Sequence, residues 1–379
     1  MKRPRLEVWA SDFDPDRGGI QAYSSFLKRA LREVAQGLEV RGVAKFSKSN
    51  TSSSVGVGGG LGKTIRFAGH LLGSNLTAPS SLIVVTHVNF APAALILKLL
   101  RGQPYVVAAH GIEVWGPITP LRRWALRAAS QVWAVSRYTR ERLIADQSVP
   151  AERVIVLPNT FEESRFMLGE KPNALLERYR LPLEVKVILS VGRLAASERY
   201  KGFDRVIAAL PEIAKQHPTV RYLIAGRGDD RARLEAQARA AGVADRVIFA
   251  GFVPVEELCA HYQLCDVFAM PSTGEGFGIV FLEAMACGKL VLAGNQDGST
   301  EPLMDGQLGA LVNPNDLPAI TATISDILAG RHPNRLLFDP AQLRRRVVEE
   351  FGFERFCLQL SEMISALVSK ACSEPSRIR

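Results

Sequence analysis

The sequence predicts an α/β protein built from two doubly wound halves, each a parallel sheet with helices on both faces. Short apolar runs of strand length alternate with segments of helical period along most of the chain. Several of these runs end in polar or glycine-rich loops, which is where parallel sheets bind ligands. A length of 379 residues suits about two to three domains. We therefore expect two successive sheets with ligand-binding loops at the carboxyl ends of their strands.

The composition, with 47% hydrophobic residues, suits a soluble protein with sizeable cores. We expect no secretory leader, because the apolar run at residues 6–10 is short and an acidic loop follows it. We also expect no membrane span, because every apolar segment is far shorter than the roughly 20 residues needed. The five cysteines are odd in number and lack metal-ligand spacing, which predicts reduced thiols, a cytoplasmic location and no metal site.

The net positive charge of the chain comes entirely from its first half. Residues 1–165 carry 22 Lys or Arg and 12 Asp or Glu, a net of +10, whereas residues 166–379 carry 25 and 26, a net of −1, which together give the formal +9. No nucleic acid is expected as a partner, because basic and aromatic residues do not alternate and no helix-turn-helix or zinc spacing occurs. Two interpretations stay open: peripheral contact with an anionic membrane or phosphate-bearing acceptor, and a solvated basic surface.

The first half opens with a strand at residues 6–11 and a helix that starts at the pair Gly18 and Gly19. The helix is predicted by apolar residues at helical spacing: Ile20, Tyr23, Phe26, Leu27, Ala30 and Leu31. Two glycines between a strand and a helix allow the backbone to approach a diphosphate closely. An ordinary strand-to-helix turn is the alternative interpretation.

A glycine-rich run, KSNTSSSVGVGGGLGKT, follows the next strand at residues 39–45. A P-loop would require a glycine five residues before Gly62, and Val57 occupies that position. We therefore expect a flexible polar loop, one that orders around an acceptor.

Further strands are predicted at residues 82–86, 105–109, 133–135 and 154–157, with helices at 92–100 and 136–145. Ser136 can cap the second of these helices. His110 follows a buried strand and precedes Gly111, so it lies at the ligand-binding end of the sheet. A linker is expected at residues 161–184, a polar stretch with two prolines.

The second half begins with an apolar strand at residues 187–191, followed by Arg193 and Lys201. A diphosphate leaving group needs its charge neutralised, and a chain without a metal cluster must use cations and helix ends. The strand at 222–226 ends in AGRGDD, which lacks the third glycine of a dinucleotide fingerprint because Arg231 stands there. NAD is therefore not expected.

The stretch AMPSTGEGFGIVFLEAMACGKLVLAG predicts a strand at 267–270, a loop at 271–277, a helix at 278–287 and a strand at 290–293. The first turn of the helix offers backbone N–H groups without partners inside the helix, which favours a bound phosphate. These groups belong to Phe277, Gly278 and Ile279.

Two glutamates flank this predicted phosphate site. Glu275 lies in the loop and Glu283 lies eight residues later in the helix. Carboxylates would repel a phosphate, so they are better explained as acceptors for hydroxyl groups. We interpret Glu283 as the group that binds a ribose and Glu275 as the group that orients a sugar.

The segment EGFGIVFLEAMACG, with seven residues between Glu275 and Glu283, resembles the signature of the family 4 glycosyltransferases, a retaining group with the GT-B fold. VGRL followed by KGFD resembles a second signature of the group, and the GGI loop at Gly18 and Gly19 a third. The resemblance implies two Rossmann-like domains facing a central cleft. Residues 1–165 would form the acceptor-side domain, residues 185–350 the nucleotide-sugar domain, and the helix at 353–368 would pack back onto the first.

The resemblance also implies an activity: metal-independent, retaining hexosyl transfer to a hydroxyl acceptor in polysaccharide or glycolipid assembly. The donor would be a UDP- or GDP-linked sugar, used as a co-substrate without any further cofactor, and the acceptor a saccharide or a lipid-linked molecule. Arg193, Lys201 and the helix start at Gly278 would stabilise the departing diphosphate. Glu275 and His110 would position the sugar.

Other residues are assigned by the same resemblance. Residues 247–251, followed by Phe252 and Val253, resemble the segment whose backbone meets the nucleotide base, and Glu113 falls on the acceptor side. The sequence departs from the family pattern at Thr160 and at Gly298-Ser299, where glycines are usual, and Glu301 follows the second departure.

Two other functions fit the same predicted fold. One is a nucleotide-sugar epimerase with the same cleft, and the other is a non-catalytic binding subunit. Incubation with nucleotide sugars and no acceptor would distinguish the first, since only an epimerase would release epimerised donor. Donor hydrolysis or transfer would exclude the second.

Overall fold

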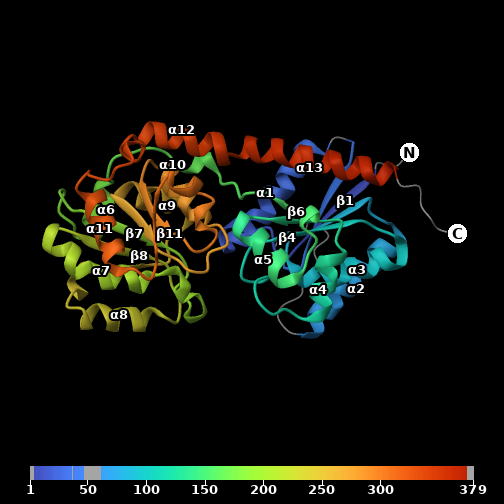
Figure 1. Ribbon diagram of the computed structural model, residues 1–379, viewed down its shortest axis with the longest axis horizontal. Coiled ribbons are helices and arrows are strands. Elements are labelled where there is room, and N and C mark those ends of the chain that lie inside the picture. Colours follow the sequence, from blue (N-terminus) through green and yellow to red (C-terminus); the bar gives the residue numbers. More distant parts are fainter. Residues whose placement is uncertain (1–3, 36, 47–60, 374–379) are drawn as a thin grey trace. The chain divides into compact units, whose positions relative to one another are not determined.

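The computed structural model describes residues 4–35, 37–46 and 61–373 (Figure 1). These residues form two compact units. The first comprises the chain up to Thr160 and again from Phe353 onward, and the second comprises Phe161–Gly352. Each unit contains one six-stranded parallel sheet. The predicted fold class, two parallel doubly wound α/β sheets, is confirmed.

The sheet of the first unit has the strand order β2-β1-β3-β4-β5-β6, with every pair parallel. Its strands are β1 (Arg5–Ala10), β2 (Glu39–Ala44), β3 (Leu82–Val85), β4 (Tyr105–Ala109), β5 (Gln131–Ala134) and β6 (Val154–Val156). β3 and β4 are buried along their whole length, as expected for strands covered on both faces. The strand order reverses between β1 and β3, which is the topological switch point of this sheet. The loop between β1 and α1 therefore lies where parallel sheets bind ligands.

Six helices belong to the first unit: α1 (Gly19–Val34), α2 (Leu61–Thr77), α3 (Ala91–Arg101), α4 (Pro120–Ala128), α5 (Arg137–Gln147) and α13 (Phe353–Ser373). α3 packs against both α2 and α4 (Figure 1). α13, the last helix of the chain, packs on α1. In that contact the guanidinium of Arg29 lies 3.6 Å from the ring centre of Phe353, and Phe356 meets Tyr23 edge to face.

Two of these helices were not predicted from the sequence. The expected glycine-rich loop extended to residue 64, but α2 already begins at Leu61, because Phe67 and Leu71 bury one helical side against the core. The rest of that expected loop, residues 48–60, lies outside the described residues. α4 was not predicted, although its apolar residues Leu121, Trp124, Ala125 and Ala128 recur at helical spacing.

The second unit repeats the arrangement with the strand order β12-β11-β10-β7-β8-β9. Its strands are β7 (Val187–Val191), β8 (Arg221–Ala225), β9 (Val247–Gly251), β10 (Val267–Met270), β11 (Leu290–Gly294) and β12 (Ala310–Val312). Its helices are α6 (Asn173–Arg178), α7 (Phe203–Gln216), α8 (Arg231–Ala240), α9 (Val255–Leu264), α10 (Ile279–Ala286), α11 (Leu317–Leu328) and α12 (Pro340–Phe351). The order reverses between β7 and β10, so the loops after these two neighbouring strands meet at the switch point.

The segment expected to be a linker, residues 161–184, belongs to the second unit instead. It contains α6, whose Leu175 and Leu176 are buried, and its Phe161 and Phe166 are buried as well. These four buried apolar side chains pack this stretch into the second unit. Its two prolines and its polar residues had suggested a linker instead.

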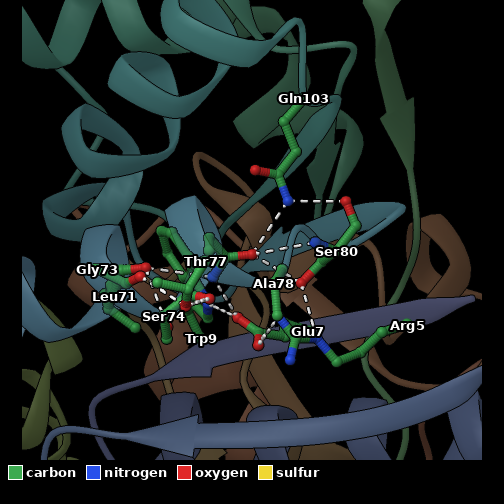
Figure 2. A network of polar contacts seen from close by, with 11 residues as sticks. Arg5, Glu7, Trp9, Leu71, Gly73, Ser74, Thr77, Ala78, Ser80 and Gln103 are labelled. Carbon is green, nitrogen blue, oxygen red and sulfur yellow. Dashed lines mark hydrogen bonds and ion pairs between the residues drawn. The ribbon is translucent and has the colours of Figure 1, made fainter.

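A buried polar network joins the elements of the first unit at the amino ends of the strands (Figure 2). Glu7 of β1 is fully buried, and its carboxylate accepts hydrogen bonds from Trp9 Nε1 at 2.9 Å and Asn75 Nδ2 at 2.8 Å. Arg5 forms an ion pair with the other carboxylate oxygen at 3.2 Å. The Asn75 side-chain oxygen in turn accepts from Gln103 at 3.1 Å, just before β4. The network thus links β1, α2 and the approach to β4.

Candidate active site

The charged residues predicted for the second unit gather at the carboxyl edge of its sheet. Arg193 and Lys201 lie in the segment after β7, and Glu275 lies in the loop after β10. Because β7 and β10 are hydrogen-bonded neighbours at the switch point, these two loops emerge side by side. Residues separated by more than seventy positions in sequence are therefore brought into contact.

Lys201 is the centre of this cluster. Its ammonium lies 3.2 Å from a carboxylate oxygen of Glu275 and 3.6 Å from one of Glu198, and its side chain is only 14% exposed. Burial by itself would lower the pKa of Lys201, but Glu275, Tyr200 and Glu198 together raise it above its usual value. The lysine is therefore a fixed, partly desolvated positive charge.

Arg193 lies beside the same cluster and is much more open to solvent. Its guanidinium pairs with Glu198, while 74% of its side chain is exposed. Glu198 thus contacts both predicted cations, Arg193 and Lys201, and its own side chain is buried. A single carboxylate can in this way hold two cations at one place while leaving one of them accessible.

The loop that carries Glu275 is fixed by a second buried carboxylate. Asp297 accepts hydrogen bonds from the Glu275 backbone N–H at 2.7 Å, from the Ser272 hydroxyl at 2.7 Å and from the Ser299 backbone N–H at 2.9 Å. Burial raises the pKa of Asp297, and these hydrogen bonds act against that shift. Gly298 is required in the same place, because a Cβ there would lie 2.0 Å from the carbonyl oxygen of Gly276.

α10 begins directly beyond this loop. Gly278 adopts the left-handed conformation, with φ of 88°, and a Cβ on it would lie 2.5 Å from the Phe281 ring, so glycine is required at this position. Within the described part of the chain, the amides of Phe277, Gly278 and Ile279 donate no hydrogen bond. The start of α10 therefore offers backbone donors to an anion.

Glu283 lies one turn into α10. The hydroxyl of the buried Tyr262 on α9 donates to its carboxylate at 2.7 Å. Burial raises the pKa of Glu283 to about 7, although the Tyr262 hydrogen bond and the charge of Arg165 act in the opposite direction. The Glu283 carboxylate is therefore fixed in position, and burial disfavours its charged form. A carboxylate held in this way can accept a hydrogen bond from a ligand hydroxyl.

The segment after β9 offers an aromatic surface. The ring of Phe252 is 55% exposed, and the guanidinium of Arg227, which follows β8, lies 4.4 Å from its centre. Val253 comes next and is half-buried. An exposed ring with a stacked guanidinium is suited to contact with a planar base.

The predicted residues of the first unit lie at the carboxyl edge of their own sheet. Gly18 caps α1 with φ of 145°, and Gly19 is the first helical residue; apart from its chain neighbours and the nearby helix backbone, no atom lies within 4 Å of where its Cβ would be. His110 follows β4, its Nε2 lies 2.9 Å from the Thr86 carbonyl oxygen, and the Glu113 carboxylate accepts from its backbone N–H at 2.6 Å. Glu113 is therefore engaged in holding the His110 turn.

Sequence reasoning missed three residues that organise the site: Glu198, Asp297 and Tyr262. Glu198 had a local signal, because it lies three residues before Lys201 in a short helical turn. Asp297 caps the short turn at Gly298–Thr300, which the pattern D-G-S could have indicated. Tyr262 gave no signal, because only the packing of α9 against α10 brings it to Glu283.

Neither a metal centre nor a membrane span is found in the part of the chain that the structure describes. No group of three or more His, Cys, Asp or Glu side chains there could hold a metal ion. Across the same residues, none of the helices combines the length and the apolar character that crossing a bilayer requires.

Two family models match the chain. The one described as Glycosyl transferases group 1 matches residues 173–345, and the one described as Glycosyl transferase 4-like domain matches residues 13–160. The first match contains the Lys201 cluster and α10, and the second contains the Gly18-Gly19 loop and His110.

Similar curated proteins include the GDP-mannose-dependent alpha-(1-6)-phosphatidylinositol monomannoside mannosyltransferase of Mycolicibacterium smegmatis. It is 34% identical over 383 residues, which cover 94% of this chain and 97% of that protein. The 2-deoxystreptamine glucosyltransferase of Streptomyces kanamyceticus is 30% identical over 269 residues, covering 67% of this chain and 68% of that protein.

Solved structures share the fold over nearly the whole chain. Sucrose-phosphate synthase from Thermosynechococcus elongatus matches with a TM-score of 0.80 and 22% identity, covering 97% of this chain and 100% of that one. Anabaena HepE in complex with UDP matches with a TM-score of 0.76 and 20% identity, covering 96% and 100%. At these identities the likeness shows the fold, which is GT-B. Together with the full-length relative, these findings show that the chain belongs to the family 4 glycosyltransferases, retaining enzymes that move a sugar from a nucleotide-sugar donor to a hydroxyl acceptor.

Proposed function

We propose that this chain transfers mannose from GDP-mannose to a hydroxyl of a phosphatidylinositol-based glycolipid at a membrane surface. The choice of sugar, nucleotide and acceptor is supported by the mycobacterial relatives, which match along almost their entire length. The transfer chemistry is supported by the cluster at the switch point of the second unit.

The chemistry is supported by the Lys201 ammonium, which is fixed between Glu275 and Glu198, and by the free amides at the start of α10, two to four residues after Glu275. We assign Lys201, Arg193 and the amides of Gly278 and Ile279 to the diphosphate of the donor. As the glycosidic bond to the sugar breaks, negative charge develops on the departing diphosphate, and these groups stabilise it without a metal. Arg193 is exposed enough to close on the diphosphate once it binds.

Glu275 is assigned to the sugar. Its carboxylate can accept hydrogen bonds from sugar hydroxyls while its contact with Lys201 keeps it oriented. In the proposed step the acceptor hydroxyl oxygen bonds to the anomeric carbon on the face that the diphosphate leaves. The hydroxyl proton passes to a phosphate oxygen, so the products are the glycoside and protonated nucleoside diphosphate.

The nucleoside is assigned to two other places on the same edge of the sheet. Glu283, held by Tyr262, would accept hydrogen bonds from the ribose hydroxyls. Phe252, with Arg227 stacked on it, would contact the base, and the backbone at Val253 would hydrogen-bond its edge. His110 of the first unit stays a predicted sugar contact.

The test is a donor and acceptor screen with the purified full chain. GDP-mannose, UDP-glucose and UDP-galactose are each supplied with detergent-dispersed phosphatidylinositol monomannoside, and products are separated and analysed by NMR. We expect transfer from GDP-mannose alone, giving an α-mannoside. Transfer from a UDP-sugar instead, or transfer only to soluble saccharides, would overturn the assignment of donor or acceptor respectively. A reaction without acceptor controls for donor hydrolysis.

A further inference from the structure

An unusual concentration of exposed apolar side chains lies on two neighbouring helices of the first unit. Of the twelve large apolar side chains that are exposed among the described residues, five lie on α3 and α4. They are Ile96 (41% exposed), Leu99 (61%), Leu100 (63%), Leu121 (52%) and Trp124 (52%). Single exposed apolar residues are common on protein surfaces, but a group of this size usually marks an interaction site.

The spacing of these residues places them on the outer sides of both helices. On α3 they recur at intervals of three and four residues, and on α4 at an interval of three, so each set forms one helical stripe. The two helices pack against each other, and Lys98 Nζ of α3 donates to the Ala128 carbonyl oxygen at the end of α4 at 2.6 Å. The inner sides of the same helices are buried in the core, through residues such as Leu97 and Leu126.

The part of the sequence that contains the two stripes is strongly basic. Between Glu39 and Glu141 the sequence contains a single acidic residue, Glu113, and twelve Lys or Arg. Neither α3 nor α4 contains an acidic residue. Arg101 at the end of α3 and Arg127 at the end of α4 are both exposed. Within the described residues neither forms an ion pair, so their charge is not neutralised by the protein.

We propose that this region, the α3–α4 surface, docks the protein peripherally on an anionic lipid bilayer. It is defined by Leu99, Leu100, Leu121 and Trp124 with Arg101 and Arg127. The leucines and the tryptophan ring enter the boundary between headgroups and acyl chains, while the arginines contact lipid phosphates. Trp124 suits this boundary because its ring is apolar and its indole N–H is polar.

The charge argues for a bilayer rather than for a second copy of the chain. A symmetric dimer through this surface would bring the arginines of one copy toward those of the other, and like charges across an interface oppose association. An anionic bilayer satisfies the apolar stripes and the cations together. The negative charge of such a bilayer also attracts a basic protein surface from a distance, before the two are in contact.

The inference explains how the proposed lipid-borne acceptor would be reached, and it rests on the proposed function only for that purpose. Docking can be measured without any transfer, and transfer can be measured with detergent-dispersed acceptor without any bilayer. Failure of one can therefore be told from failure of the other.

The experiment is co-sedimentation of the full chain with vesicles of phosphatidylcholine alone or of phosphatidylcholine with phosphatidylglycerol. We expect binding to the anionic vesicles only, weakening as salt is added. Arg101→Gln with Arg127→Gln should weaken the partition coefficient by about fivefold per arginine. Leu99→Ser with Leu100→Ser should weaken it by about tenfold and should leave some salt-dependent attraction.

Matched controls use exposed residues of the second unit. Leu183→Ser removes an exposed leucine and Arg239→Gln removes an exposed arginine, and neither should change vesicle binding. Insertion has an optical signature as well, because the Trp124 ring should leave water. We expect a blue shift of tryptophan fluorescence on adding anionic vesicles, and Trp124→Phe should remove most of it.

Three outcomes would overturn the proposal. The first is no binding to anionic vesicles at low salt, and the second is binding that the α3–α4 variants leave unchanged. The third is concentration-dependent self-association that these variants abolish, which would assign the surface to a second copy of the chain. Circular dichroism of each variant establishes that it folds.

Discussion

At the residue scale, Lys201 has a position that a free surface lysine would not adopt. Glu275 and Glu198 hold its ammonium within 3.2 and 3.6 Å in a setting that is largely buried. Fixing a charge in advance is what makes it effective in a transition state, because no reorganisation is needed when charge develops. The contact with Glu275 also means that the two groups are oriented together.

We expect Lys201→Ala and Glu275→Ala each to lower kcat by about 100-fold or more, since each would remove a group that the proposed function assigns to the departing diphosphate or to the sugar. The measurement is steady-state transfer by the purified variants, with circular dichroism to establish that they fold. Lys215→Ala, on the exposed side of α7, is the matched control and should retain full activity. Near-normal turnover in either site variant would refute its assignment.

Glu283 leads to a prediction about stability and pH. Burial raises the pKa of its carboxyl group to about 7 in the folded protein, from an ordinary value of 4.5. Between these two values the folded protein binds a proton that the unfolded chain does not, so this group lowers the free energy of unfolding as pH rises from 4.5 to 7. Above about pH 7, ionisation of Glu283 lowers the free energy of unfolding no further.

Glu283→Gln should therefore change the free energy of unfolding more favourably at pH 8 than at pH 4.5. The expected difference between the two changes is about 1 to 3 kcal/mol. Urea unfolding at the two pH values measures the difference. Glu256→Gln, at an exposed position of α9, serves as the control and should show no such dependence. Equal effects of Glu283→Gln at both pH values would mean that this carboxyl group is already ionised at low pH in the folded state.

At the scale of elements, the polar network around Glu7 connects parts of the first unit that are distant in sequence. Glu7 of β1, Asn75 of α2 and Gln103 before β4 exchange hydrogen bonds within the core (Figure 2). Such a network stabilises only while every member is satisfied. The network fixes the positions of α2 and of the segment before β4 relative to β1.

Glu7→Ala should lower the free energy of unfolding by about 3 kcal/mol, because it leaves Arg5 without its ion pair and Trp9 and Asn75 with buried donors that lack acceptors. Chemical denaturation followed by near-ultraviolet circular dichroism measures the change. Glu39→Ala, at the exposed start of β2, is the control and should cost less than about 0.5 kcal/mol. A similar cost for both variants would show that the network does not contribute to stability.

At the scale of the whole molecule, the first unit is completed by the end of the chain. α13 buries Phe356, Leu360 and Ile364, and it packs on α1. α1 follows the Gly18-Gly19 loop, so α13 supports the helix that begins at this predicted donor-binding loop. Contacts of such high sequence separation form only after the rest of the chain has been made.

Truncation after Gly352 should expose the side of α1 that carries Tyr23 and Phe26 and should destabilise the first unit selectively. Hydrogen exchange followed by mass spectrometry should show loss of protection in α1 and β1, with α10 and β10 unchanged. Leu358→Ala, at an exposed position of α13, is the control and should leave the protection of α1 unchanged. Unchanged protection in α1 after the truncation would contradict this role for α13.

Much of the fold followed from local pattern. Buried parallel strands read as continuous apolar runs, so β4, β7 and β10 could be predicted to the residue. α2 and α4 were not predicted: glycines obscure the start of α2, and α4 is short, with only Ala125 and Leu126 buried. For the site, the sequence identified the charged residues near the strand ends, and the structure brings Lys201 and Glu275 together.

The sequence by itself determined the alternation of strands and helices, the family and the residue types available for chemistry, because these depend on short-range periodicity and on motifs within about ten residues. Only the tertiary structure decided which residues support them. Glu198 between two cations, Asp297 behind the Glu275 loop and Tyr262 against Glu283 are contacts across loops or between helices. Packing creates such contacts, and no spacing along the chain encodes them.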